Sequence, residues 1–547
     1  MYIEKIKLRD GEELNPTLFN VIIGGNAVGK TTILLELFDN ICSANRSRWY
    51  WVDTLIFNST DMHYDISLML QSMVRQWEGS NLYYYSQATR NRDGNLDLGG
   101  NLRFSPSEYD KIKRDLENEE PQLSIELFGE PKYRRPFTTL LNCETRLILP
   151  SAIEVIRLDQ PPQNPLNVLY RNRRLLREIS DAIKNQFALE LNLLSHKATI
   201  IDLGLADNSA PLFDPNTEDL QVEFEKVEVW KSQNFTPVEE IGHGIRSMLR
   251  ILLSLLDPMS QIFLIDEPEM HLYPSQKRWV GRQLVKLARE QQKQVFIVTH
   301  DPMVLQGILD TQGTTTIYRV DQDNNRNRQI KSCILENIPD VGAIRNQDQY
   351  LQGLFYQRCI AVEGASDRAF YQSMVEDYSE IEDKDLGFIA CGGKGSSKYV
   401  VSIAVQTGLR CAFIYDFDAI LSDLGTIEDI YSMLGGDTSQ LGSLKAVVDS
   451  LVSDKHATKP AAIKQAERLG IQSPLVQDHY AVFDKAMKAL NAVGIFVVPH
   501  GTLESWAPDV EPKVRFPDKA PDVVRADPAL KARFDDFMRP ILNYLGC

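Results

Sequence analysis

The sequence lacks several features that mark membrane, secreted and disulfide-rich proteins. No apolar run reaches the ~18 to 20 uncharged residues that span a bilayer, since the most apolar stretch, residues 248–265, contains Arg250 and Asp257. The opening residues MYIEKIKLRDGEE lack the apolar core of a signal peptide. The seven cysteines are odd in number and form no C-x-x-C pair, which indicates reduced thiols. We therefore expect a cytoplasmic protein that does not associate with a membrane.

An excess of basic residues is also missing. The 59 lysines and arginines are outnumbered by 75 aspartates and glutamates, which gives a formal net charge of −16. A nucleic-acid partner would therefore need a local basic patch, or divalent metals held by clustered acids. With 547 residues, 43% of them hydrophobic and 24% charged, the chain can form more than one globular domain and is not mostly disordered.

The first 320 residues have the pattern of an α/β protein. Nearly continuous apolar runs at 20–23, 262–265 and 295–298 are each followed by a polar turn and a helical stretch. Such runs are typical of parallel strands covered on both faces. Residues 60–135, rich in Asn, Asp, Gly, Arg and Tyr, predict an irregular or antiparallel insertion, and residues 165–195 predict one long helix.

A second α/β unit follows a polar linker near residues 321–328. The apolar runs that predict its strands are residues 360–362, 387–390, 411–415 and 495–498. Residues 426–490 predict a helical insertion. Between Trp506 and a last helix near 529–545, five prolines predict an extended segment, and we expect this tail to wrap the second unit.

A nucleotide-binding motif follows the first apolar run. Residues 24–31, GGNAVGKT, match G-x-x-x-x-G-K-[ST] between a predicted strand and a helix. In such a loop, backbone N–H groups surround phosphates, Lys30 neutralises the β and γ oxygens, and the Thr31 hydroxyl joins a Mg²⁺ shell. The structural alternative is a glycine turn before a core helix. The predicted nucleotide contacts are Gly24, Asn26, Gly29, Lys30, Thr31 and Thr32.

Two later strands end in polar residues suited to the same site. The run 262–265 ends in Asp266 and Glu267, which can hold Mg²⁺ and activate a water, respectively. The run 295–298 is followed by His300, whose imidazole can sense the γ-phosphate. We predict Glu267 and His300 as catalytic and Asp266, with Thr31, as a metal ligand.

The separation of these motifs resembles the ABC-type ATPase heads of the SMC, Rad50 and RecF group. Asp266 lies 236 residues after Lys30, and those heads carry a large insertion at this place. The resemblance implies a signature loop that acts on the ATP of a partner subunit, for which Gly242 and Gly244 are the candidates here, although E-I-G-H-G-I-R-S departs from the usual Ser-Gly-Gly-Gln pattern. It also implies a dimer that encloses two ATP molecules.

A second set of acids follows the strands predicted in the second unit. Glu363 ends one run and Asp367 lies in the next helix's first turn, Asp416 and Asp418 end another run at i and i+2, and Glu504 follows a third. Residues two apart share a face in extended backbone, and the carboxyl ends of parallel strands meet at one edge of a sheet. Hard oxygen donors select Mg²⁺ or Mn²⁺. All five acids are therefore predicted metal ligands.

This order of acids resembles a TOPRIM domain, the metal-binding fold of topoisomerases, DnaG-type primases and certain nucleases. Between the acids, the glycine-rich segment C-G-G-K-G-S-S-K supplies Lys394 or Lys398 for the charge of a pentacoordinate phosphate. A flexible turn is the alternative. The predicted catalytic residues of this site are Glu363, Asp416, Asp418 and Lys394.

An ABC-type head followed by a TOPRIM domain resembles the OLD (overcoming lysogenization defect) family of ATPase-nucleases. The resemblance extends from Ile3 to about Trp506 and includes the runs E-P-E-M-H-L-Y-P and G-T-L-E. It implies an α/β chain with an ABC-type (SMC/Rad50/RecF-like) P-loop ATPase head and a Rossmann-like TOPRIM domain. The predicted parts are an ATPase domain at 1–345 with an insertion at about 60–235, a TOPRIM domain at 351–510 with a helical insertion at about 426–490, and a C-terminal extension at 511–547.

The resemblance implies ATP and Mg²⁺ (or Mn²⁺) as cofactors and an ATP-regulated endonuclease acting on DNA in bacterial defence against phage. Implied partners are a second copy, as a dimer or tetramer through the ATPase heads, and a defence-system protein or nucleoprotein, as in Gabija systems and retrons. RNA such as tRNA stays open as the substrate, as does an SMC- or RecF-like repair clamp that binds DNA without cutting it. Candidate backbone contacts are Arg171, Arg173, Arg174 and Arg177, for which a solvated helix face is the alternative.

Overall fold

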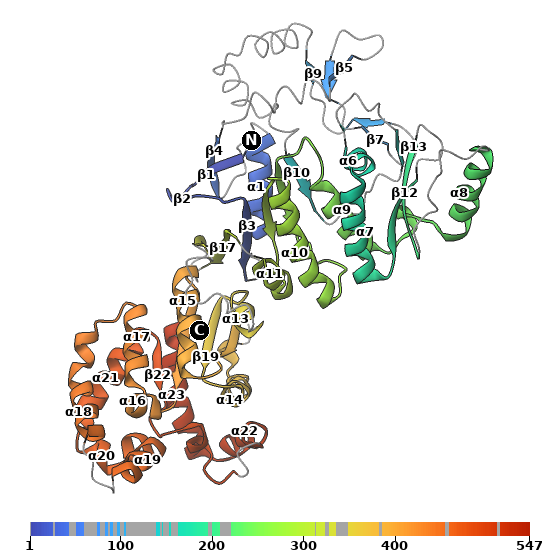
Figure 1. Ribbon diagram of the computed structural model, residues 1–547. Coiled ribbons are helices and arrows are strands. Elements are labelled where there is room, and N and C mark those ends of the chain that lie inside the picture. Colours follow the sequence, from blue (N-terminus) through green and yellow to red (C-terminus); the bar gives the residue numbers. More distant parts are fainter. Residues whose placement is uncertain are drawn as a thin grey trace. The chain divides into compact units, whose positions relative to one another are not determined.

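A computed structural model gives the fold of two compact units, residues 1–22 with 29–316 and residues 23–28 with 317–547 (Figure 1). The structure describes residues 2–25, 28–42, 51–58, 74–76, 83–85, 88–90, 96–98, 103–104, 138–142, 145, 152–154, 162, 164–194, 200–207, 220–311, 313–322, 328–334, 348–381, 385–453, 459–510 and 515–547. Asn26, the linker residues 323–327 and most of the predicted insertion at 60–135 lie outside the described residues. The domain boundaries given above stay predictions.

The first unit is built on parallel strands that are almost entirely apolar. The strands β10 (Thr138–Leu141), β15 (Ile262–Asp266), β16 (Gln294–Val298) and β3 (Phe19–Gly24) are neighbours in this order and run parallel. Residues 317–322 of β17 (Thr315–Gln322) and all of β18 (Arg328–Ile334) belong to the second unit. Every residue of β3 and β16 is buried, as in strands covered on both faces. The three strands predicted from apolar runs are confirmed.

Helices cover this sheet and two smaller antiparallel sheets accompany it. Helix α1 packs against β10, β15 and β16, and α10 packs against α11 and α9. The small sheets have the orders β2-β1-β4 and β11-β13-β12, with β14 beside β13. The bounds are α1 (Lys30–Cys42), α8 (Leu220–Asn234), α9 (His243–Ser254), α10 (Pro274–Glu290), α11 (Pro302–Leu309), β1 (Tyr2–Leu8), β2 (Glu13–Leu14), β4 (Val52–Asn58), β11 (Ala152–Glu154), β12 (Glu190–Leu194), β13 (Ile200–Ala206) and β14 (Thr236–Pro237).

The predicted single helix at 165–195 is wrong. The structure has α6 (Pro165–Arg171), α7 (Arg173–Phe187) and then β12. Asn172 separates the helices because its side chain accepts a hydrogen bond from the N–H of Leu175 (3.0 Å) and so caps α7. The described strands inside the predicted insertion do pair antiparallel, β5 (Val74–Gln76) with β6 (Tyr83–Tyr85), β6 with β9 (Arg103–Phe104), and β7 (Ala88–Arg90) with β8 (Leu96–Leu98).

The second unit contains a four-stranded, fully parallel sheet. Its order is β20 (Leu386–Ala390), β19 (Arg358–Val362), β21 (Arg410–Tyr415) and β22 (Ile495–Val497). Every residue of β19 is buried. All four predicted strands of this unit are therefore confirmed. The helices that follow β19, β20 and β21 are α14 (Ala365–Val375), α15 (Lys394–Thr407) and α16 (Asp418–Ser422), and α13 (Asp348–Gly353) precedes the sheet.

The predicted helical insertion at 426–490 is present and packs beside the last strand. It comprises α17 (Leu424–Met433), α18 (Gly442–Ser453), α19 (Lys459–Leu469), α20 (Pro474–Gln477) and α21 (Tyr480–Ala492). Helix α21 contacts β22 (Figure 1). The insertion also approaches the loop after β22 at Gly501, where a Cβ atom would lie 2.1 Å from the carbonyl oxygen of Arg468. At its φ of +120°, only glycine fits this contact without strain.

The chain's tail is more helical than its prolines predicted. The structure has α22 (Phe516–Ala526) before α23 (Pro528–Leu545) where an extended segment was expected. Pro517 lies in the first turn of α22, where no N–H is needed, although Pro521 lies inside the helix. Both helices contribute buried residues to the core around β19 and α14, including Phe516 and Phe534. The tail thus wraps the second unit, as expected.

Every helix in the described part of the chain is too short or too polar to cross a bilayer.

Candidate functional site

The predicted phosphate loop joins β3 to α1. Gly24 and Gly29 have φ angles of +146° and +98°, the second of which glycine alone adopts readily. Lys30 begins α1 and its side chain is buried. The Thr31 hydroxyl donates a hydrogen bond to the Oδ1 atom of Asp266 (3.2 Å). The structure thus brings together the two predicted Mg²⁺ ligands of the nucleotide site, although they are 235 residues apart.

Glu267 and His300 meet beside this pair. The Nε2 atom of His300 lies 3.2 Å from the Oε1 atom of Glu267. Burial, followed by the charge of Lys30, lowers the pKa of His300, although Glu267 opposes the shift. Glu267 has a φ of +48°, a conformation that is uncommon for a residue with a side chain. A neutral imidazole therefore orients the carboxylate expected to activate water.

Glu269 was not predicted as a site residue, but its side chain holds the backbone of His300 in place. One oxygen of its buried carboxylate accepts hydrogen bonds from the Thr299 hydroxyl (2.9 Å) and the His300 N–H (2.8 Å). Burial raises the pKa of Glu269 to about 7. In the sequence, Glu269 is the second glutamate of the run E-P-E. It was noted there only as part of a family motif, without a role of its own.

The candidate signature loop lies at the start of α9. Gly242 is the N-cap residue, and the space where its Cβ would project is open for 4 Å. A Cβ on Gly244 would lie 2.5 Å from the carbonyl oxygen of His271, so α9 packs closely against the segment that follows Glu267 and Glu269. Thr32 is half-buried within α1.

In the second unit, the predicted acids gather at the carboxyl ends of β19, β21 and β22. Glu363 follows β19 and accepts a hydrogen bond from the backbone N–H of Asp416 (3.0 Å), which follows β21. Asp367 lies in the first turn of α14, as predicted. Glu504 lies after β22 in a 3₁₀ turn (Leu503–Trp506) and accepts a hydrogen bond from the Thr502 hydroxyl (2.7 Å).

Burial and the charges of neighbouring acids raise the pKa values of three of these acids. Burial raises the pKa of Glu363 to about 7 and that of Asp367 to about 6. Burial also raises the pKa of Asp416 well above its usual value, and the charges of Glu363, Asp367 and Asp418 raise it further. The charges of Glu504 and Asp418 act on Asp367 in the same direction. The charge of each of the five predicted acids therefore acts unfavourably on at least one other, which a bound cation would relieve.

The backbone between Asp416 and Asp418 differs from the expectation. The prediction that the two share a face of extended chain is wrong, because β21 ends at Tyr415, Phe417 is in the helical region and Asp418 begins α16. The N–H of Phe417 donates to the carbonyl oxygen of Gly501 (2.8 Å), which holds this bend against the loop after β22. Asp418 is brought to the site by the bend and not by strand periodicity.

Lys394 is the basic residue of this site. It begins α15, directly after Gly392 and Gly393, and its Nζ atom lies 2.5 Å from the Oδ1 atom of Asp418. Burial disfavours its charge, but the hydrogen bond that Lys394 donates to Asp418 and the charge of Glu363 outweigh burial and raise the pKa of Lys394. Lys398 is exposed and its Nζ atom lies over the ring of Tyr399, 5.3 Å from its centroid. The structure therefore favours Lys394 over Lys398.

The acids do not yet form a closed ligand shell. Within the described ranges, no group of three or more Asp, Glu, His or Cys side chains is arranged to hold a metal ion. One of the five carboxylates, that of Asp418, forms an ion pair with Lys394. The donor chemistry fits a hard divalent cation, but the side chains must turn inward to bind one.

Comparison with known proteins finds a matching family model for two regions of the chain. The family model described as AAA ATPase domain matches residues 106–305, and the model described as overcoming lysogenization defect protein-like, TOPRIM domain matches residues 354–418. The chain joins an ATPase domain to an OLD-like TOPRIM domain. This confirms the predicted α/β fold class and the order of its two domains.

One curated relative and several solved structures are similar to this chain. The OLD nuclease of Thermus scotoductus (strain ATCC 700910 / SA-01) is 24% identical over 441 residues, which cover 73% of this chain and 77% of the relative. An SMC head bound to the C-winged helix domain of ScpA is 13% identical with a TM-score of 0.30, and covers 61% of this chain and 98% of that one. The SMC head domain from Thermotoga maritima is 11% identical with a TM-score of 0.27 and the same coverages, 61% and 98%.

The two matches cover most of the residues predicted for the sites. The ATPase match includes Gly242, Gly244, Asp266, Glu267 and His300, whereas the phosphate loop lies before its first residue. The TOPRIM match includes Glu363, Asp367, Lys394, Asp416 and Asp418 and ends before Glu504. The roles of these residues stay predictions.

The candidate backbone-contacting arginines lie on α6 and α7. Arg173, Arg174 and Arg177 are exposed, and Arg174 pairs with Glu178 across one helical turn (3.0 Å). Arg171 is half-buried at the end of α6. This arrangement is that of a solvated helix face, and their contact with nucleic acid stays a prediction.

Replacing Glu269 by glutamine is expected to make the ATPase domain more stable at high pH. An unfolded glutamate titrates near 4.5, whereas burial raises the folded pKa of Glu269 to about 7. The folded state therefore binds more protons between these values, and stability falls as the pH rises through them. From pH 5 to pH 8, Glu269→Gln should gain on the order of 3 kcal/mol of unfolding free energy relative to wild type.

Chemical denaturation at several pH values measures this gain. Glu290→Gln is the matched control, because Glu290 is exposed at the end of α10. Its Oε1 atom lies 3.8 Å from the Nζ atom of Lys286 in a surface ion pair, which contributes little to stability. A difference between Glu269→Gln and wild type that stays constant with pH would contradict the assignment.

Proposed function

We propose that this protein is an ATP-regulated, divalent-metal-dependent endonuclease that hydrolyses phosphodiester bonds in DNA. The observation that carries the proposal is the gathering of Glu363, Asp367, Asp416, Asp418 and Glu504 around one edge of the TOPRIM sheet, with Lys394 beside them. Crowded acids with raised pKa values are unfavourable unless a cation neutralises them. The name of the Thermus relative, OLD nuclease, supports the same reaction.

The five acids would hold Mg²⁺ or Mn²⁺ in this site. When bound, such ions supply a water acidic enough to act as nucleophile and a Lewis acid for the leaving 3′ oxygen. The chain's own residues prepare these positions. The backbone N–H of Asp416 fixes one oxygen of Glu363, and the Thr502 hydroxyl fixes one oxygen of Glu504.

Lys394 would stabilise the negative charge that develops on the phosphorane. Its Nζ atom already lies against Asp418, and its raised pKa keeps it protonated at neutral pH. Lys394 would turn from Asp418 toward the phosphate when Asp418 holds a cation. Its positive charge would then lower the barrier because it stabilises the negative charge that develops on the phosphate oxygens.

ATP would regulate cleavage through the ATPase domain. The pair Thr31 and Asp266 would complete the shell of a Mg²⁺ ion on the phosphates, and Glu267, oriented by His300, would activate the hydrolytic water. We propose further that two ATPase domains pair around ATP, with the Gly242 and Gly244 loop of each facing its partner. The open space around Gly242 supports this.

The cellular role would be defence against phage, alone or with a helicase or a retron nucleoprotein. The description of the matched TOPRIM model, which names a lysogenization defect, supports this setting. RNA stays the alternative substrate, because carboxylates and metal ions do not read the sugar by themselves. A repair clamp that binds DNA without cutting it is the alternative from another class.

Cleavage of a substrate panel tests the proposal. The purified protein is incubated with supercoiled plasmid, linear duplex DNA and bulk tRNA in Mg²⁺ or Mn²⁺, with and without ATP, beside the Asp416→Ala/Asp418→Ala variant. We expect wild type to cut DNA, at a rate that ATP changes, and the variant to leave it intact. Cleavage of tRNA alone would favour the ribonuclease, and ATP-dependent DNA binding with intact strands would favour the clamp.

A further inference from the structure

A buried tyrosine–tryptophan pair joins two elements that carry acids of the TOPRIM site. The indole Nε1 of Trp506 donates a hydrogen bond to the hydroxyl oxygen of Tyr371 (3.1 Å). Both side chains are buried, with 0% and 1% of their surfaces exposed. Buried polar groups are costly unless their hydrogen bonds are made, so this contact fixes the position of the phenol oxygen.

Each member of the pair is close in sequence to one acid of the site. Tyr371 lies four residues after Asp367 on α14, so the two share a face of that helix. Trp506 lies two residues after Glu504 in the 3₁₀ turn that follows β22. The hydrogen bond therefore joins the two elements that carry Asp367 and Glu504, whose charges act on each other.

The Tyr371 hydroxyl can also donate a hydrogen bond. An indole N–H can only donate, so Tyr371 is the acceptor in this bond and its own proton is left over. In the described part of the chain, no acceptor for that proton is found. Burial raises the pKa of Tyr371, and the charges of Asp416, Asp367 and Glu363 raise it further. Among these three charges, that of Asp416 raises the pKa of Tyr371 the most.

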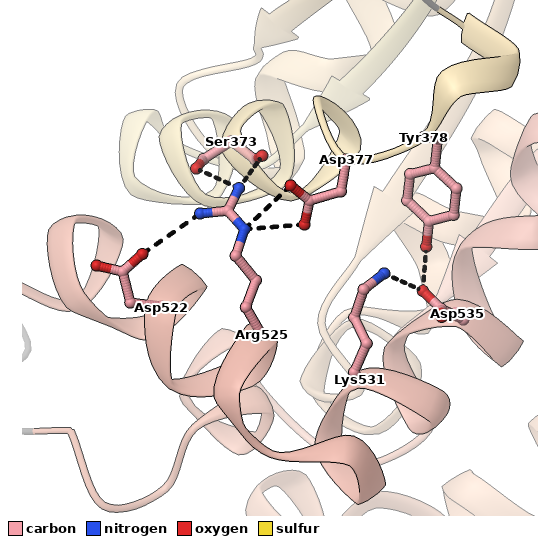
Figure 2. A network of polar contacts seen from close by, with 7 residues as sticks. All are labelled: Ser373, Asp377, Tyr378, Asp522, Arg525, Lys531 and Asp535. Carbon is pink, nitrogen blue, oxygen red and sulfur yellow. Dashed lines mark hydrogen bonds and ion pairs between the residues drawn. The ribbon is translucent and has the colours of Figure 1, made fainter.

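The C-terminal helices hold α14 in place for this role (Figure 2). Arg525 of α22 forms an ion pair with Asp377 (2.8 Å) and donates to the carbonyl oxygen of Ser373 (2.7 Å). Asp535 of α23 accepts hydrogen bonds from the Tyr378 hydroxyl (2.5 Å) and from Lys531 (2.6 Å). The ring of Phe534 stacks on Tyr371, with centroids 6.1 Å apart, and meets Trp506 edge to face at 5.2 Å.

We propose that Tyr371 is a positioning residue of the metal site, whose hydroxyl is held by Trp506 and donates a hydrogen bond to the carboxylate of Asp416 when the cation is bound. This bond would fix the rotamer of Asp416, so that one oxygen faces the cation and the other faces Tyr371. The inference rests on the proposed metal-dependent function. It also connects the C-terminal helices with that function, since these helices carry the aromatic contact with Tyr371 and the polar contacts that hold α14.

Metal affinity of the full-length, nucleotide-free protein tests this role independently of cleavage. Mn²⁺ binding is titrated calorimetrically for wild type, Tyr371→Phe, Tyr378→Phe and Asp416→Asn. Tyr371→Phe should weaken Mn²⁺ binding at the TOPRIM site about tenfold, since hydrogen bonds to charged groups contribute this much. The Mn²⁺ concentration for half-maximal cleavage should rise by the same factor while the rate at saturating Mn²⁺ changes little.

Tyr378→Phe is the matched control. It removes the same hydroxyl group from a residue just beyond α14, but that hydroxyl bonds Asp535 on the side of the C-terminal helices. It should lower thermal stability without changing Mn²⁺ affinity. Trp506→Phe in the Tyr371→Phe background should cause no further loss of affinity, because its contribution acts through the hydroxyl already removed.

The outcomes separate this inference from the proposed function. Wild-type Mn²⁺ affinity in Tyr371→Phe, with affinity lost in Asp416→Asn, would overturn the positioning role and leave the metal site in place. Equal losses in Tyr371→Phe and Tyr378→Phe would also overturn it, because they would show a general effect of loosening α14. Unchanged binding in Asp416→Asn would contradict the metal site itself and the inference with it.

Discussion

Asp416→Asn is expected to lower the rate of metal-dependent cleavage by about a thousandfold, because bound metals contribute several kcal/mol to such reactions. Asparagine keeps the shape of the side chain and the backbone N–H that holds Glu363. It removes the central negative charge, on which Glu363, Asp367 and Asp418 all act. Steady-state nicking of plasmid at saturating Mg²⁺ measures the loss.

The control for Asp416 is Asp484→Asn. Asp484 lies on α21 and forms a surface ion pair with Lys488 (2.7 Å), which contributes little to stability. Its replacement should leave nicking within about twofold of wild type. Comparable nicking by Asp416→Asn and wild type would show that the cutting site lies elsewhere.

Glu267→Gln is expected to lower ATP hydrolysis by about a thousandfold while ATP binding is retained, since general-base catalysis contributes 10²- to 10⁴-fold. The amide oxygen can still accept a hydrogen bond from His300, which lies 3.2 Å from the carboxylate in wild type. Thr31, Asp266 and Lys30, which would hold the nucleotide, are unchanged. Phosphate release and equilibrium binding of a fluorescent ATP analogue separate the two effects.

The matched control on the same domain is again Glu290→Gln, an exposed glutamate at the end of α10. It should hydrolyse ATP at the wild-type rate. Retained hydrolysis in Glu267→Gln would remove this residue from the reaction and leave His300 or a neighbouring group as the base.

Strands were the part of the fold that the sequence predicted best. Parallel strands buried on both faces need continuous apolar runs, and those at 262–265 and 411–415 could be read directly. Helix boundaries depend on single capping residues, so Asn172 divided a helical pattern whose apolar periodicity continues across it. Pro517 was read as a sign of extended chain although the first turn of a helix accepts proline equally well.

The candidate sites were predictable where a residue follows a strand directly. Glu363 and Asp266 are examples, because parallel strands bring their carboxyl ends to one edge. A bend at Phe417 brings Asp418 to its site, and the alternation of residues along a strand does not predict this bend. Tyr371 and Trp506, which are 135 residues apart, carry no local signal of their contact, since only the folded core brings α14 and the 3₁₀ turn together.

Anomalous scattering from Mn²⁺ in crystals of the wild-type protein tests the central claim most directly. The account predicts one or two anomalous peaks in the TOPRIM domain, about 2.1 Å from carboxylate oxygens of Glu363, Asp416 and Asp418. Lys394 should have moved away from Asp418 in that structure. Mn²⁺ peaks confined to other parts of the protein at saturating concentration, with the Lys394–Asp418 ion pair intact, would contradict it.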